Sequence, residues 1–161
     1  MKKVLMLLVF LTSIFLLSGC DETVSYDVQT KYLYSNDGTE GTYREGVQEF
    51  YVNTRIYLVI EITYSASTKN EVSLEFDINI PHAEHYDAFY FDGQKIDPSY
   101  DSVAKILTYT PTLIFSKEPK TTKLVFQITP TQEGIARITV EFPDVVDASM
   151  NSQDTVQFVL A

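Results

Sequence analysis

The segment from Glu71 to Ile80 alternates strictly between polar and apolar residues, and this alternation constrains the fold more than any other feature. Its apolar members are Val72, Leu74, Phe76, Ile78 and Ile80. Successive side chains of a strand point to opposite faces of a sheet, so one face of this segment is buried and the other is solvated. One-sided strands of this kind are typical of antiparallel sheets. The apolar face needs a cover, which predicts a second sheet packed on the first.

Shorter stretches of the same kind recur along the chain. Further strands are predicted over residues 24–34, 47–52, 55–64, 88–91, 94–96, 103–110, 112–116, 123–129, 135–142 and 155–160. Asp92-Gly93 predicts a tight hairpin turn, whereas residues 35–46, with three of the six glycines, and residues 97–102 are predicted loops. After residue 20 no apolar periodicity of helical type is sustained. Many short strands separated by turns predict an all-β, antiparallel β-sandwich.

The first twenty residues have a different character. Lys2 and Lys3 precede an apolar run from Val4 to Leu17, which is shorter than the roughly 20 residues of a membrane-spanning helix. This layout is typical of a secretory signal peptide. The run ends in Leu17-Ser18-Gly19-Cys20, which resembles the lipobox of bacterial lipoproteins. A plain membrane anchor, or ordinary cleavage that leaves Cys20 as a free thiol, are the alternatives.

The lipobox resemblance implies that a diacylglyceryl group is added to the sulfur of Cys20 and that the chain is cut before this residue. Two acyl chains give stable membrane attachment. We therefore predict a lipoprotein signal peptide over residues 1–19 and a single β-sandwich domain over residues 20–161. The domain is expected on the extracytoplasmic face of a bacterial membrane, and no cofactor other than the covalent lipid is predicted.

The second half of the chain is similar to bacterial immunoglobulin-like domains. The stretch Phe89–Ile96 resembles a middle hairpin of those domains, and Ile128–Val140 resembles their turn and penultimate strand. The resemblance spans roughly Asp87 to Leu160 and implies an immunoglobulin-like β-sandwich. The chain has no Trp and no cysteine besides Cys20, so it lacks the inter-sheet disulfide of antibody domains. Such folds carry many functions, so the fold does not assign one.

The composition is acidic. The formal net charge is −10, and it becomes two units more negative when Lys2 and Lys3 are removed with the signal peptide. A nucleic-acid-binding protein needs a positive surface, so this partner is excluded. An acidic surface attracts cations or a basic protein partner. Simple solubility next to a negatively charged envelope is the alternative explanation.

The two histidines of the chain, His82 and His85, lie three residues apart, with Glu84 and Asp87 beside them. Imidazole nitrogens and carboxylates are good ligands for zinc and other divalent metals. The four residues therefore form a candidate metal site. A structural zinc site needs four well-placed ligands, so a solvated loop between strands is the alternative.

Eleven tyrosines are an unusual number for a chain of this length. Tyr86, Tyr90 and Tyr100 lie near the predicted hairpin and form a candidate binding surface, because tyrosine combines a large contact area with a polar tip. Tyrosine is also common in strands, where it packs against neighbours. Both interpretations remain open from the sequence.

No sequence motif of nucleophilic catalysis is present, and there is no glycine-rich phosphate loop. We therefore predict a non-enzymatic binding or interaction module, anchored to the membrane, with a protein partner in the cell envelope. The alternative is a lipoprotein that binds a small ligand or a metal and serves a membrane transporter.

Overall fold

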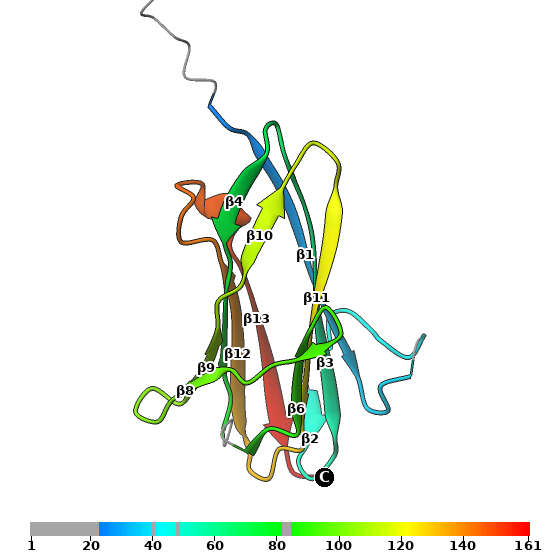
Figure 1. Cartoon of the computed structure of the whole chain (residues 1–161). Coiled ribbons are helices and arrows are strands. Elements are labelled where there is room, and N and C mark those ends of the chain that lie inside the picture. The colour runs from blue at the N-terminus through cyan, green and yellow to red at the C-terminus, as the bar shows by residue number, and fades with distance from the viewer. Residues whose placement is uncertain (1–22, 40, 48, 82–84) are drawn as a thin grey trace, which may run out of the picture.

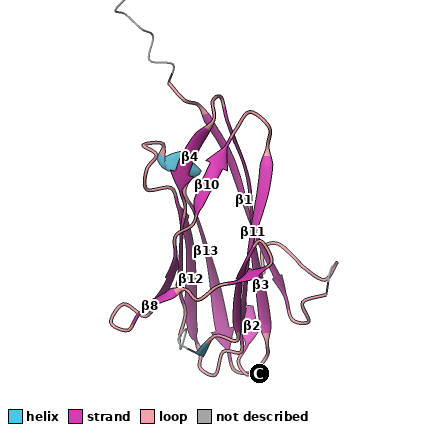
Figure 2. Cartoon of the chain, viewed as in Figure 1, coloured by secondary structure: helices cyan, strands magenta, loops and turns pink. Residues whose placement is uncertain are grey.

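The computed structural model describes residues 23–39, 41–47, 49–81 and 85–161 (Figure 1). Regular structure in these ranges is almost entirely β-strand, with a 3-10 helix, η2, over Ala148–Met150 (Figure 2). The described ranges contain no helix long and apolar enough to span a bilayer.

Two large sheets and one small sheet make up the fold. The first has the order β1-β3-β11-β6-β7, with β1 at Tyr26–Ser35, β3 at Ile56–Ala66, β11 at Lys120–Ile128, β6 at Ala88–Phe91 and β7 at Gln94–Lys95. The second has the order β2-β13-β12-β5-β9-β8, with β2 at Glu49–Tyr51, β13 at Ser152–Val159, β12 at Gly134–Glu141, β5 at Glu75–Asn79, β9 at Ile106–Tyr109 and β8 at Ser99–Asp101. The small sheet pairs β4, Asn70–Ser73, with β10, Thr112–Phe115.

The two large sheets share one hydrophobic core. Alternate residues of β3, such as Ile60 and Ile62, are fully buried, and they join the same cluster as Phe76 of β5 and Val140 of β12. Each sheet therefore covers the apolar face of the other, as the alternation in the sequence requires. The predicted all-β fold, an antiparallel β-sandwich, is confirmed. One pair departs from the antiparallel pattern, because β2 runs parallel to β13.

The prediction of one strand over residues 71–80 is wrong in one respect. The segment divides at Leu74 into β4, which pairs with β10, and β5, which pairs with β12 and β9. The cause lies in the opposite strand. Pro111, which lies between β9 and β10 along the chain, has no N–H, so it interrupts the hydrogen-bond ladder opposite Leu74. Leu74 donates its N–H to the carbonyl of Pro111 at 2.9 Å. Both chain segments therefore pass between the small sheet and the second large sheet at the same point.

Two turns show how local chemistry sets the hairpins. Asp92 and Gly93 have φ values of 46° and 78°, and they join β6 to β7 as predicted. The predicted loop 97–102 instead contains β8, and the strand predicted from residue 103 begins at Ile106. Asp101 accepts hydrogen bonds from the N–H groups of Val103 and Ala104, which closes a tight turn between β8 and β9.

Candidate functional site

A surface hollow of about 430 Å³ lies between the loop after β1 and strand β2. We call it the β2 hollow; its polar lining includes Asp37, Thr42, Arg44, Glu49 and Tyr51. Three of these side chains carry formal charges, and Tyr51 is 53% exposed. Strand β2 lies at the end of the sandwich beside the C-terminus (Figure 1). The hollow therefore combines charge with an exposed aromatic ring.

Asp37 is held in place by its own loop. One carboxylate oxygen accepts hydrogen bonds from the Thr42 hydroxyl at 2.6 Å, the Thr39 N–H at 2.9 Å and the Ser35 hydroxyl at 3.0 Å. These hydrogen bonds lower the pKa of Asp37 to about 2, and the bond from Thr42 has the largest effect. Ser35 is only 4% exposed and also accepts from the N–H of Gly38. The negative charge on this wall of the hollow is thus fixed in position.

The same loop is fastened to the first sheet on both sides. A side chain at Gly38 would bring its Cβ to 2.8 Å from the Tyr57 ring, and φ is +70°, so this position requires glycine. Farther on, Arg44 and Tyr34 exchange two backbone hydrogen bonds of 2.9 and 3.0 Å. Asp37 and Arg44 consequently sit on a backbone fixed at both ends.

Strand β2 forms the other wall. Phe50 points inward and packs against Tyr34, with ring centroids 5.5 Å apart, so its neighbours Glu49 and Tyr51 face solvent. Tyr34 in turn donates its hydroxyl to Asp154 of β13 at 2.6 Å. Burial, and then this hydrogen bond, raise the pKa of Tyr34. The floor of the hollow is therefore an ordered part of the core.

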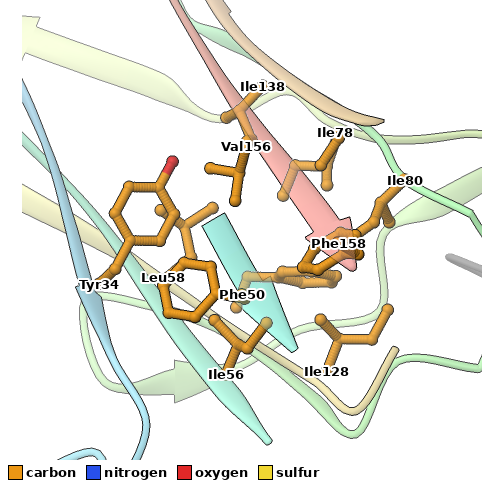
Figure 3. A pocket seen from close by; sticks show the side chains of 12 residues that line it. Tyr34, Phe50, Ile56, Leu58, Ile78, Ile80, Ile128, Ile138, Val156 and Phe158 are labelled. Carbon is orange, nitrogen blue, oxygen red and sulfur yellow. The ribbon is translucent and has the colours of Figure 1, made fainter. Parts of the chain in front are cut away.

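Below Tyr34 and Phe50 is a small internal cavity of about 20 Å³ (Figure 3). Figure 3 shows apolar side chains around it, including Leu58, Val156 and Phe158. A space of this size accommodates about one water molecule, and its lining offers almost no polar partner for one. It is a packing defect of the core, so the outer hollow is the better candidate for recognition.

The three tyrosines predicted as a binding surface do not lie on one face. Tyr86 packs on the buried rings of Phe89 and Phe126, at centroid distances of 6.3 and 6.2 Å. Tyr90 follows Phe89 in β6 and therefore points to the opposite, outer face of its sheet. Tyr100 is in β8, on the other sheet, and packs against the core. Binding by these tyrosines stays a prediction, but each would contribute from a separate place.

The predicted metal ligands are only partly described. His82 and Glu84 lie outside the described residues, as does Cys20, so the metal and lipid predictions are not tested at these positions. His85 is exposed, and Asp87 accepts a hydrogen bond from the Thr129 hydroxyl and contacts Arg55 at 3.4 Å. Within the described ranges no three His, Cys, Asp or Glu side chains are grouped closely enough to hold a metal ion.

Sequence reasoning did not single out the β2 hollow. The hydroxyl and carboxyl residues between Ser35 and Thr42 are a local sign of a self-bonded loop and could have been recognised. The position of β2 could not, because it depends on parallel pairing with the end of β13, far along the chain.

Comparison with known proteins supplies no family. No family model matches the chain, and the comparison with curated proteins found no match. Among solved structures, the CARDB domain of a Pyrococcus furiosus protein, solved in complex with di-metal ions, has 18% identity and a TM-score of 0.45, over 84% of this chain and 96% of that one. The N-terminal domain of PorA has 11% identity and a TM-score of 0.36, over 81% and 96%. These likenesses concern the fold alone.

Proposed function

We propose that this protein is a non-enzymatic binding module, held outside a bacterial membrane by a lipid on Cys20, which recognises a protein partner through the β2 hollow. The observation that carries the proposal is the hollow itself. Its lining includes the carboxylate of Asp37, which three hydrogen bonds hold in place, and the exposed ring of Tyr51. Fixed charges and rigid aromatic rings are characteristic of protein recognition sites.

The charge of the molecule favours a basic partner. Asp37 and Glu49 contribute two carboxylates to the hollow against the one cation of Arg44, and the whole chain carries a net charge of −10. A negative surface of this kind accelerates encounter with a positive one. Tyr51 then supplies the contact area that a charged rim lacks.

The position of the hollow agrees with anchoring at the N-terminus. The described chain enters β1 at one end of the elongated sandwich, and β2 lies at the other end (Figure 1). A lipid on Cys20 would therefore be attached at the end of the sandwich opposite the hollow, so the anchor itself would not cover the hollow.

The partner is tested by photo-crosslinking in cells. A benzophenone side chain in place of Tyr51 should give one adduct of defined mass, and Glu49→Lys should weaken it by reversing a charge in the hollow. The matched control is the same label in place of Ile114, which is 42% exposed on β10 at the far end. Equal labelling at both positions, or no adduct at Tyr51, contradicts the proposal.

The anchor is tested separately. Cys20→Ala removes the sulfur that would carry the lipid, so the protein should leave the membrane fraction and no longer partition into detergent. A variant that still fractionates with membranes like the wild type would show that Cys20 is not the anchor, whatever the result at Tyr51.

A second candidate function follows from the volume of the hollow. About 430 Å³ is within the range of small-molecule sites, which favours a carrier of a small polar ligand for a transporter. Native mass spectrometry of the protein released gently from membranes distinguishes the two. A bound species of small mass that is lost in Tyr51→Ser would replace the protein partner.

A further inference from the structure

The outer edge of β1 is the longest strand edge that the described chain leaves open. At the ends of the two large sheets, β7 has two residues and β2 and β8 have three each, whereas β1 has ten. Short edge strands prevent pairing with other chains, and a long edge permits it. The bridge between Tyr34 and Arg44 covers the last part of β1, which leaves the edge from Tyr26 to Leu33.

The peptide groups that face this edge can be identified. Tyr34 directs both its N–H and its C=O away from β3, since both bond to Arg44. Ser25 directs its C=O the other way, to the N–H of Ser67. Because these directions alternate along a strand, Tyr26, Val28, Thr30 and Tyr32 present their N–H and C=O groups to the open edge.

The same edge has an incompletely covered apolar side. Tyr26, Val28 and Tyr32 point towards the core and pack against it, but each remains only partly buried. Their outward neighbours Asp27, Gln29 and Lys31 are exposed. A strand added beside β1 would therefore continue the ladder and cover apolar surface at the same time.

We propose that this strand is β1 of a second copy of the chain, paired antiparallel about a two-fold axis at Gln29. In this register Val28 lies opposite Thr30 of the partner subunit, and both present their peptide groups to the interface. On the outer face, Asp27 lies opposite Lys31 of the partner subunit, and the symmetry makes this ion pair twice. Opposite charges directly across two strands stabilise the pairing.

Charge complementarity selects this register from its neighbours. An axis at Val28 or Thr30 keeps the same peptide groups at the interface but separates Asp27 from Lys31 of the partner subunit. An axis at Lys31 places two lysines opposite each other, which is unfavourable. The axis at Gln29 also lies near the middle of the open stretch, so pairing ends before the bridge at Tyr34.

Disulfide cross-linking of the full chain in its membrane tests the register. Residues at the axis form a non-hydrogen-bonded pair with Cα atoms about 4.5 Å apart, a distance that a disulfide can span. Gln29→Cys should therefore give a dimer on a non-reducing gel. In Lys31→Cys the two sulfur-bearing positions are four residues out of register, about 13 Å apart, and should not cross-link. The wild type, with Cys20 alone, shows the background.

Charge exchange tests the same contact without cysteine. In detergent, Asp27→Lys or Lys31→Asp alone should weaken the dimer about tenfold, because two ion pairs become two repulsions. The double variant should recover the wild-type dissociation constant, and a mixture of the two single variants should form a heterodimer.

The outcomes decide the proposal. Cross-linking in Gln29→Cys but not in Lys31→Cys, with recovery in the double exchange, supports the dimer. A full-length chain that sediments as a monomer at all concentrations overturns it, and so does equal cross-linking at both positions. All the substituted side chains are exposed, so circular dichroism should show an unchanged fold.

Discussion

Glu75 and Glu141 face each other directly across β5 and β12. Burial, followed by the charges of Asp77 and Glu141, raises the pKa of Glu75 above its ordinary value of 4.5. The unfolded chain therefore releases this proton at a lower pH than the folded one. It follows that Glu75 destabilises the fold once the pH rises above its unfolded pKa, and that this cost is absent in acid.

Glu75→Gln should raise the free energy of unfolding at pH 7 by about 0.5 kcal/mol, because it removes a like-charge pair from directly opposite positions. The gain should vanish near pH 3, where the carboxyl is protonated in both states. Urea denaturation at the two pH values measures it. Glu71→Gln, at an exposed position of β4, is the control, and an equal gain at both pH values would show that charge is not the cause.

At the scale of elements, the β6–β7 hairpin shows how a turn is joined to the sheet. Asp92 accepts hydrogen bonds from the Thr122 hydroxyl at 2.6 Å and from the Lys123 N–H at 2.8 Å, both in β11. Thr122 is only 1% exposed. The residue that makes the turn thus also satisfies a buried hydroxyl of the neighbouring strand.

Asp92→Ala should lower the free energy of unfolding by about 1–3 kcal/mol, because it leaves the buried Thr122 hydroxyl without its acceptor. Adding Thr122→Val should recover part of the loss, since both partners are then apolar. Thermal or urea unfolding measures both changes. Asp97→Ala, in the exposed segment that follows, is the control; if it costs as much as Asp92→Ala, the loss does not come from Thr122.

The strands that sequence predicted best are those governed by local alternation. Ile56, Leu58, Ile60, Ile62 and Tyr64 share the buried face of β3 as expected. The change of sheet at Leu74 could not be predicted from its own segment, because Pro111 in the opposite strand causes it. The separation of Tyr86, Tyr90 and Tyr100 has the same origin, since nearness in sequence does not determine which sheet or face a side chain joins.

At the scale of the whole molecule, two tyrosines of β1 connect the sheets. The Tyr32 hydroxyl lies 2.8 Å from the Ser152 hydroxyl, and Tyr34 donates to Asp154. Burial raises the pKa of Tyr32 from 10 to about 12 and that of Tyr34 also rises. The two hydroxyls contribute fully to the free energy of unfolding below the pKa of tyrosine in the unfolded chain. This contribution is lost as the pH rises through their pKa values in the folded state.

The thermal midpoint should therefore fall steeply between about pH 10 and pH 12, where the unfolded tyrosines ionise first. Tyr32→Phe combined with Tyr34→Phe should be less stable at pH 8 but lose less over this alkaline range. Calorimetry and tyrosinate absorbance follow the two effects. Identical alkaline slopes in variant and wild type would show that these two hydroxyls do not link the sheets in this way.

The lowered pKa of Asp37 makes the charge of the β2 hollow insensitive to moderate acid. The Asp37 carboxyl, bonded to three donors of its loop, keeps its negative charge down to about pH 2. Acidification of the surroundings to about pH 4, where an ordinary aspartate is half protonated, would leave this charge unchanged. A cationic ligand bound through Asp37 would thus keep this contact at a pH at which an ordinary carboxylate becomes protonated and loses its charge.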